Sequence, residues 1–148
     1  MPARAQPLAL GALSEPLTSC VRAFDRAQRA GFFRVGDTVV IQGSGPIGIL
    51  AVAAAQEMGA GRVIVVGAPE DPRLALCRRF GAETTVSLED HETPEARIEA
   101  VRGLTEPFGA DLAYPTSGSL NLGGTGVVIN NADLTGIVRF AVPESGFG

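Results

Sequence analysis

The chain of 148 residues is long enough for one domain that buries roughly two-thirds of its unfolded surface. Its composition, 45% hydrophobic and 19% charged, excludes an intrinsically disordered chain. The net charge of −4 argues against nucleic acid as a partner, because phosphate binding favours a basic face. No apolar run reaches the ~18 residues of a membrane-spanning helix, so we expect no membrane partner. Two cysteines do not make a disulfide framework and fit reduced thiols in a cytoplasmic protein better.

The first predicted element is a helix over residues 14–31, with Ser14 as its N-cap and Gly31 as its end. Apolar residues recur there at helical spacing, with charged residues on the other side. A turn follows, and Thr38–Gln42 is a β-branched run typical of a buried parallel strand. We therefore expect residues 1–36 to be a helical lead-in to a domain that begins at residue 37.

Strands and helices then alternate along the chain. Helical patterns cover residues 46–58, 71–80 and 93–104, and strand-like runs cover residues 62–66, 84–88 and 111–114. Such alternation indicates βαβ units. The predicted fold class is α/β, with a Rossmann-like, doubly wound parallel sheet over residues 37–118.

After Gly118 the alternation stops. The next strand-like run, residues 126–130, follows a glycine-rich segment with no helical period. A parallel neighbour normally needs a crossover of about a dozen residues or more, usually a helix. The sheet is therefore predicted to be truncated, with the crossover helix after the fourth strand missing. Residues 119–148 are predicted to form an atypical glycine-rich β tail, which either adds a β-ribbon through residues 130–133 or is poorly ordered.

The segment GSGPIG, residues 43–48, fits the pattern G-x-G-x-x-G between a strand and a helix. In such a turn Gly43 allows the tight bend, Gly45 lets the backbone approach a pyrophosphate, and Gly48 lets the helix lie close to the strand. The free N–H groups at the start of the helix attract phosphate. The pattern predicts a dinucleotide site, and the alternative is a glycine-rich turn without a ligand.

The second strand ends at Gly67, where dinucleotide-binding domains usually have an acidic residue for the adenosine ribose. Without that carboxylate, a ribose 2′-phosphate meets no repulsion, and Arg73 could reach such a phosphate. NAD and NADP both remain open as the cofactor. The other interpretation of Arg73 is a solvated helix residue.

Three segments resemble the medium-chain, zinc-type alcohol dehydrogenases and their sorbitol and threonine dehydrogenase relatives: EPLTSCVRAF, GDTVVIQGSGPIGILAVAAAQEMGAGRVIVV and RLALCRRFGAE. The resemblance covers about residues 10–118. It implies a Rossmann cofactor domain, hydride transfer between an alcohol and NAD(P), and dimers or tetramers. It places two groups of residues at the cofactor: Gly43, Gly45, Pro46, Ile47 and Gly48 at the pyrophosphate, and Thr116 and Ser117 beside the nicotinamide ribose.

The resemblance also gives Glu15 a candidate role at a metal. This residue matches a position where polyol and threonine dehydrogenases keep a carboxylate at or near the catalytic zinc. Alternatively, Glu15 only favours the start of its helix. The family's amino-terminal catalytic domain is missing from this sequence, so we assign no catalytic residue. His91 is expected to be solvent-exposed, and Cys20 and Cys77 to be buried or half-buried without a metal.

These features predict the cofactor-binding part of an NAD(P)-dependent zinc-type alcohol dehydrogenase. We expect no turnover from this chain alone, and we expect it to form homo-oligomers or to pair with a catalytic domain. The alternative is a non-catalytic dinucleotide-binding or oligomerisation module. A truncated gene, a degenerate paralogue or an engineered fragment would each explain the missing crossover and the short carboxyl half.

Overall fold

The computed structural model describes residues 7–105, 109–116, 126–129 and 137–140. Its strands form one sheet in the order β3-β2-β1-β4-β5-β6. Their bounds are β1 (Thr38–Gln42), β2 (Arg62–Gly67), β3 (Thr84–Ser87), β4 (Leu112–Pro115), β5 (Gly126–Ile129) and β6 (Ile137–Phe140). The pairs from β3 to β5 are parallel, and β6 is antiparallel to β5. The predicted α/β class with a parallel sheet is confirmed.

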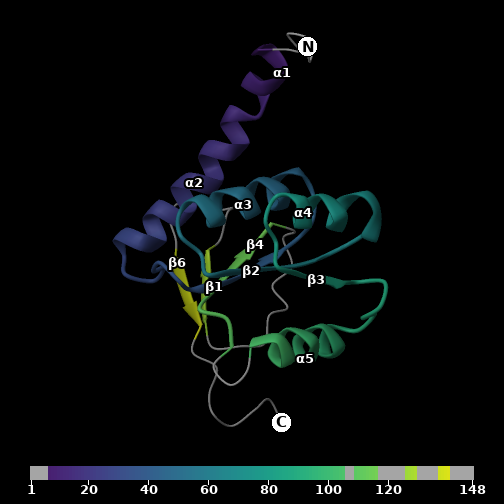
Figure 1. Ribbon diagram of the computed structural model, residues 1–148. Coiled ribbons are helices and arrows are strands. Elements are labelled where there is room, and N and C mark those ends of the chain that lie inside the picture. Colours follow the sequence, from purple (N-terminus) through teal and green to yellow (C-terminus); the bar gives the residue numbers. More distant parts are fainter. Residues whose placement is uncertain (1–6, 106–108, 117–125, 130–136, 141–148) are drawn as a thin grey trace.

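Helices cover both faces of this sheet. They are α1 (Pro7–Ala12), α2 (Ser14–Arg29), α3 (Pro46–Glu57), a π-helical turn η1 (Glu70–Leu74) that leads into α4 (Ala75–Arg79), and α5 (Pro94–Thr105). Figure 1 shows α2, α3 and α4 on one side of the sheet and α5 on the other. This arrangement confirms the doubly wound architecture, since each βα crossover places its helix on one face.

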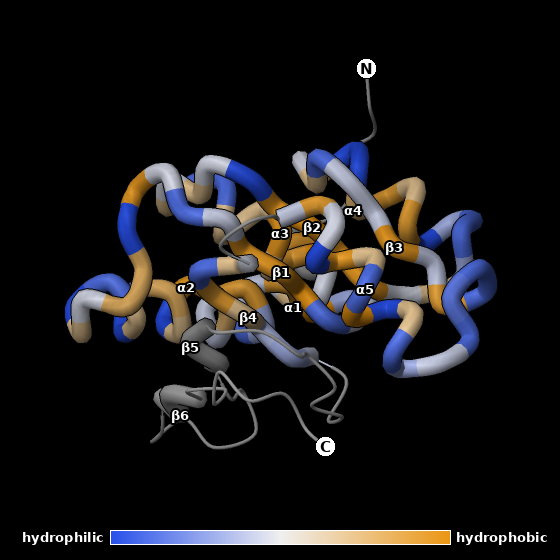
Figure 2. The backbone as a smooth tube through the Cα atoms, turned by 90° about the horizontal axis from the view of Figure 1, so that it is seen from below, coloured by the Kyte–Doolittle hydropathy of each residue, from blue (hydrophilic) through white to orange (hydrophobic). Residues whose placement is uncertain are grey.

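Alternation along each strand supplies a separate core to each face. Val39 and Ile41 face α2 and α3, where they pack with a row of buried alanines in α3. Val40 faces α5 and packs with Val101 of that helix. Figure 2 shows the apolar residues concentrated in β1, β2 and α3, between more polar outer segments. Strands buried on both faces explain why their sequences are continuous apolar runs.

The start of α2 differs from the prediction. Ser14 is not an N-cap: it is the first residue of α2, and the preceding Leu13 is itself in the right-handed helical region. The α1 helix therefore runs almost directly into α2, and the Leu17 N–H donates to the Leu13 carbonyl at 3.0 Å. The break falls at Leu13 because Pro16, three residues later, has no N–H to donate to the carbonyl four residues before it.

The end of α2 agrees with the prediction. Gly31 has φ of +77°, and the Phe32 N–H reaches back to the Ala27 carbonyl at 2.8 Å. This pair of features is the Schellman ending, in which a left-handed glycine lets the chain close the last helical turn. The chain then turns into β1, so α2 shares one core with the sheet.

The tail adds strands to the sheet. β5 pairs in parallel with β4, with Val127 beside Leu112, and β6 then returns antiparallel to β5. The ribbon expected as one alternative is therefore present. Its predicted turn at residues 130–133 and the predicted loss of the crossover helix at residues 117–125 lie outside the described residues. The domain boundaries at residues 37 and 119 stay predictions. In the described part of the chain, no helix is long and apolar enough to cross a membrane.

Candidate functional site

The glycine turn joins β1 to α3. Gly43 has φ of +116°, and its N–H donates to the Val66 carbonyl of β2 at 2.8 Å. A Cβ on Gly48 would lie 2.0 Å from the Gly43 carbonyl oxygen. Only glycine therefore lets the first turn of α3 lie against the end of β1. This contact is the close approach of helix and strand that the sequence pattern predicted for Gly48.

Gly45 has a different reason to be glycine. It is the N-cap of α3, with φ of −75° and an extended backbone that any residue adopts. A Cβ there would meet no atom of the described residues within 4 Å. Neither the backbone conformation nor the packing of the described residues requires glycine, and a side chain would project into the space before the helix. The first N–H groups of a helix lack intrahelical acceptors, so this space suits an anion.

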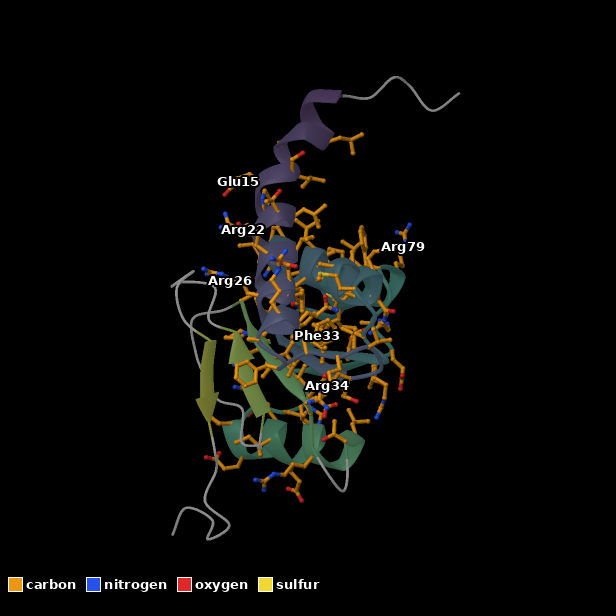
Figure 3. The ribbon with its side chains drawn as sticks, turned by 90° about the vertical axis from the view of Figure 1, so that its left-hand side faces the viewer. Glu15, Arg22, Arg26, Phe33, Arg34 and Arg79 are labelled. Carbon is orange, nitrogen blue, oxygen red and sulfur yellow. The ribbon has the colours of Figure 1, made fainter. Side chains whose placement is uncertain are left out.

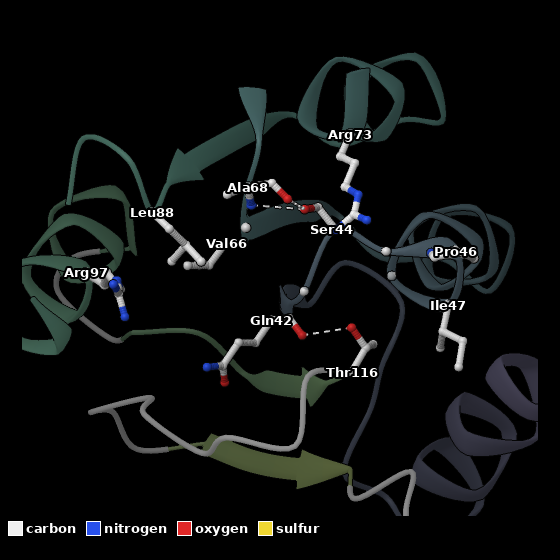
Figure 4. Close-up of a pocket in the computed structure, with 14 residues that line it drawn as sticks. Gln42, Ser44, Pro46, Ile47, Val66, Ala68, Arg73, Leu88, Arg97 and Thr116 are labelled. Atoms are coloured by element: carbon white, nitrogen blue, oxygen red, sulfur yellow. Dashed lines mark hydrogen bonds between the residues drawn. The ribbon is translucent and has the colours of Figure 1, made fainter. Parts of the chain in front are cut away.

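A pocket of about 430 Å³ opens at this end of the sheet (Figure 4). Its lining residues come from the ends of β1, β2 and β4, the glycine turn, η1, the segment after β3, and α5: Gln42, Gly43, Ser44, Gly45, Pro46, Ile47, Gly48, Val66, Gly67, Ala68, Arg73, Leu88, Arg97 and Thr116. Every residue predicted to bind the cofactor lies in this lining, except Ser117, which is outside the described residues. The carboxyl ends of parallel strands meet here, as in other open α/β sheets that bind ligands.

Ser44 ties two turns of the pocket together. Its side-chain oxygen accepts from the Ala68 N–H at 3.0 Å and donates to the Ala68 carbonyl at 2.8 Å. Ser44 is only 3% exposed. A Cβ on Gly67 would lie 2.4 Å from this oxygen. Gly67 therefore has no room for a carboxylate side chain while Ser44 holds its position, which gives a physical reason for the missing acid.

Two arginines face the pocket and no acidic side chain lies among its described lining residues. Arg73 of η1 is exposed, and within the described chain it has no hydrogen bond or ion pair. Arg97 of α5 donates from Nε to the His91 carbonyl and from Nη2 to the Glu92 carbonyl, both at 2.7 Å. The net positive charge of this lining favours an anionic ligand.

The backbone carbonyl of Gln42 is hydrogen-bonded, whereas its side-chain oxygen has no partner among the described residues. Its backbone carbonyl accepts from the Thr116 N–H at 2.7 Å and from Thr116 Oγ1 at 2.9 Å, which fixes the turn after β4 against β1. Its side-chain Oε1 is buried without a hydrogen-bond partner in the described structure. No sequence pattern predicted Gln42, Ser44 or Arg97 as site residues. Only the position of Gln42 and Ser44 next to the first glycine could have drawn attention to them.

Comparison with known proteins identifies the family. Residues 46–129 match the family described as zinc-binding dehydrogenase. The chain belongs to the zinc-binding dehydrogenase family. It is 40% identical to 5-exo-hydroxycamphor dehydrogenase of Pseudomonas putida over 121 residues, which are 81% of this chain and 32% of that protein. It is 39% identical to L-threonine 3-dehydrogenase of Bacillus subtilis, over 74% of this chain and 28% of that protein.

Solved structures give the same result. Galactitol-1-phosphate dehydrogenase from Escherichia coli superposes with a TM-score of 0.59 at 31% identity, over 77% of this chain and 30% of the other. The chain thus spans about a third of the length of these zinc-binding dehydrogenases. The part that it matches is the Rossmann sheet, in the order 3-2-1-4. Members of the family bind NAD(P), and the pocket has two features that fit this cofactor: the open space at Gly45 and the Gln42 Oε1, which has no hydrogen-bond partner among the described residues.

The catalytic zinc of the family does not fit the described residues. Glu15 is exposed on the first turn of α2, on the part of that helix that extends beyond the sheet (Figure 3). No group of three His, Cys, Asp or Glu side chains that could hold a metal occurs in the described part of the chain. The assignment of Glu15 to a zinc site therefore stays a prediction, and we derive no step through the metal.

The histidine and the two cysteines are not among the residues that line the pocket. His91, expected to be exposed, is half-buried, and its Nδ1 lies 3.1 Å from the Ser87 carbonyl. Cys20 and Cys77 are buried, as predicted, and burial raises the pKa of both thiols. Tyr114 donates its hydroxyl to Cys20 Sγ at 3.8 Å within the core.

Proposed function

We propose that this chain is the NAD(P)-binding part of a zinc-type alcohol dehydrogenase. The single observation that carries the proposal is Gly45, a glycine that neither its backbone conformation nor the packing of the described residues requires. A ligand that approaches the start of α3 closely would explain it, because a Cβ would occupy the ligand's space. The family membership and the positively charged pocket support the same ligand.

In this proposal each part of the pocket has a role toward the cofactor. The backbone N–H groups at the start of α3 bind the pyrophosphate, and Gly48 keeps the helix close enough to present them. We assign Thr116, held to Gln42 by two hydrogen bonds, to the nicotinamide ribose; the sequence resemblance assigns Ser117 to the same group. When bound, NAD(P) supplies the hydride chemistry, and this chain contributes its position and electrostatic surroundings.

We further propose that NADP binds more tightly than NAD. The pocket has Arg73 and Arg97 and no described acidic side chain, and Gly67 cannot be replaced by one without displacing Ser44. Arg97 already donates to two carbonyls, whereas Arg73 has no such bond in the described structure. Arg73 is therefore the better partner for a ribose 2′-phosphate, which guanidinium groups bind through charge-assisted hydrogen bonds.

Calorimetry with NADP⁺ and NAD⁺ tests both proposals. We expect saturable binding of both, and an Arg73→Ala variant that loses about tenfold in NADP⁺ affinity, the size of a hydrogen bond to a charged group. NAD⁺ affinity should change little. Arg79→Ala is the matched control, because Arg79 is also an exposed arginine but lies outside the pocket, at the end of α4. Absence of binding by the folded protein would refute the proposed function, and equal loss for both cofactors would refute only the role of Arg73.

The second candidate is a non-catalytic binding or oligomerisation module. It is favoured by apolar side chains that α1, α2 and the residue between them expose: Leu10 is 67% exposed, Leu13 45% and Val21 40%. Figure 1 shows this part of the chain extending away from the sheet. A second copy or a catalytic domain would cover these side chains. A strict monomer by light scattering at high concentration would argue against self-association, and alcohol-dependent reduction of NAD(P) by the purified chain would contradict a non-catalytic role.

A further inference from the structure

The side-chain amide of Gln42 is an unusual group for its position. Gln42 is the last residue of β1, and its Oε1 is buried without a hydrogen-bond partner among the described residues. Buried polar atoms are nearly always paired, and an unpaired acceptor costs the free energy of its lost hydration. The same side chain lines the pocket. A donor that enters with a ligand would therefore satisfy this oxygen.

The surroundings of Gln42 favour a flat, partly apolar ligand group. Figure 4 shows its amide on the same side of the pocket as Val66, Leu88 and Arg97, whereas Arg73, Pro46 and Ile47 lie on the other side. Val66 and Leu88 provide apolar walls. The two hydrogen bonds of Arg97 to backbone carbonyls hold its guanidinium in place. A planar guanidinium and aliphatic walls are surfaces on which nucleic-acid bases stack.

If the chain binds NAD(P), as proposed above, the adenine base of the dinucleotide lies on the side of the pocket where Gln42, Val66 and Leu88 are found. In Rossmann domains the pyrophosphate lies at the glycine turn and the adenosine ribose lies at the end of the second strand. Here those positions are Gly43–Gly48 and Gly67. The base attached to that ribose then lies on the side of the pocket that Leu88 shares with Val66, and Val66 is the register neighbour of Gln42 in the sheet.

We propose that Gln42 recognises the adenine base, with Oε1 accepting a hydrogen bond from the exocyclic amino group. A glutamine amide can pair with adenine through its amino group and a ring nitrogen, because the amide offers an acceptor and a donor side by side. The pocket thereby selects adenine nucleotides over purine nucleotides that lack the amino group. Gln42 is a specificity-determining residue that makes no contact with the reacting atoms.

The test compares two nucleotides that differ only in this amino group. Calorimetric titration of the full chain with AMP and with purine riboside 5′-monophosphate should give about fivefold weaker binding of the amino-free nucleotide, the effect of one net hydrogen bond. A Gln42→Leu variant should bind the two nucleotides within about twofold of each other. Gln56→Leu is the matched control, because it makes the same replacement at a glutamine outside the pocket, whose Nε2 donates to the Gly81 carbonyl at 2.7 Å. It should keep the fivefold preference.

The outcomes separate this inference from the proposed function. Equal binding of the two nucleotides by the wild-type chain overturns the role of Gln42, whether or not the variants fold, while NAD(P) binding continues to support the proposed function. A preference that survives in Gln42→Leu also overturns it. If the folded chain binds neither nucleotides nor NAD(P), the proposed function fails and the inference fails with it.

Discussion

Replacement of Gly45 by alanine should separate ligand binding from stability. The new Cβ meets no atom of the described part of the chain within 4 Å, and φ of −75° suits any residue. The methyl group instead projects into the space that we assign to the pyrophosphate. We therefore expect Gly45→Ala to fold normally and to bind NADP⁺ and NAD⁺ at least tenfold more weakly, which corresponds to about 1.4 kcal/mol.

The expected stability change follows from two opposing effects. Glycine to alanine at a compatible backbone position stabilises by about 0.4–1 kcal/mol, because the unfolded chain loses conformational freedom. Alanine is a poorer N-cap than glycine, with a cost on the order of 0.5 kcal/mol. The free energy of unfolding should thus stay within about 1 kcal/mol of the wild-type value.

Two assays on the same preparations check this prediction. Urea unfolding gives the free energy of unfolding, and calorimetry gives the affinity for each cofactor. Wild-type affinity in Gly45→Ala would refute the assignment of this space to a ligand. A stability loss well above 1 kcal/mol would instead show that Gly45 has a structural role that its surroundings do not reveal.

Three further substitutions test other parts of the structure. Gly48→Ala should destabilise by about 1–3 kcal/mol or more through overpacking, since its Cβ would lie 2.0 Å from a backbone oxygen; an unfolding midpoint equal to wild type would contradict this. Ser44→Ala should cost about 1–2 kcal/mol in urea unfolding by removing both bonds to Ala68, and no loss would show that these bonds are dispensable. Burial, followed by the nearby Cys20, raises the pKa of Tyr114 above its ordinary 10.0. As pH rises, the unfolded chain therefore loses the Tyr114 hydroxyl proton before the folded chain does, so the free energy of unfolding falls as pH rises through about 10 and beyond. In Tyr114→Phe the free energy of unfolding should fall less steeply with pH. An equal slope in the variant and the wild type would refute this contribution of Tyr114.

The repeating elements could be predicted because local pattern determines them. The β-branched run at Thr38–Gln42 and the glycine turn after it gave β1 with its observed bounds. The helix predicted over 71–80 is an exception: its first turn is the separate π-helical η1, with a non-helical backbone at Asp71. Similarly, Ser14 has the side chain of an N-cap, but the chain before it is already helical. In both cases the sequence identifies the helix better than its first turn.

The pocket could be predicted only where its residues are close in sequence. The glycine turn was visible as a motif, but Arg97 lies on α5, far along the chain from β1. The parallel sheet places β3 next to β2, so the β3–α5 segment lines the same pocket as the end of β1, and no local pattern reveals this. The steric conflict between Gly67 and Ser44 is likewise a contact between two turns. Sequence showed that an acid was missing, and the structure supplied the reason.

The most direct measurement of the central claim is a solution NMR titration of the full chain with NADP⁺, followed through assigned backbone amides. If the pocket binds the dinucleotide, the largest shifts should occur at Ser44–Gly48 and at Gly67–Ala68, with smaller shifts near Thr116 and Arg97. Shifts confined to other parts of the chain, or no shifts in a well-folded spectrum, would contradict the assignment of this pocket to NAD(P).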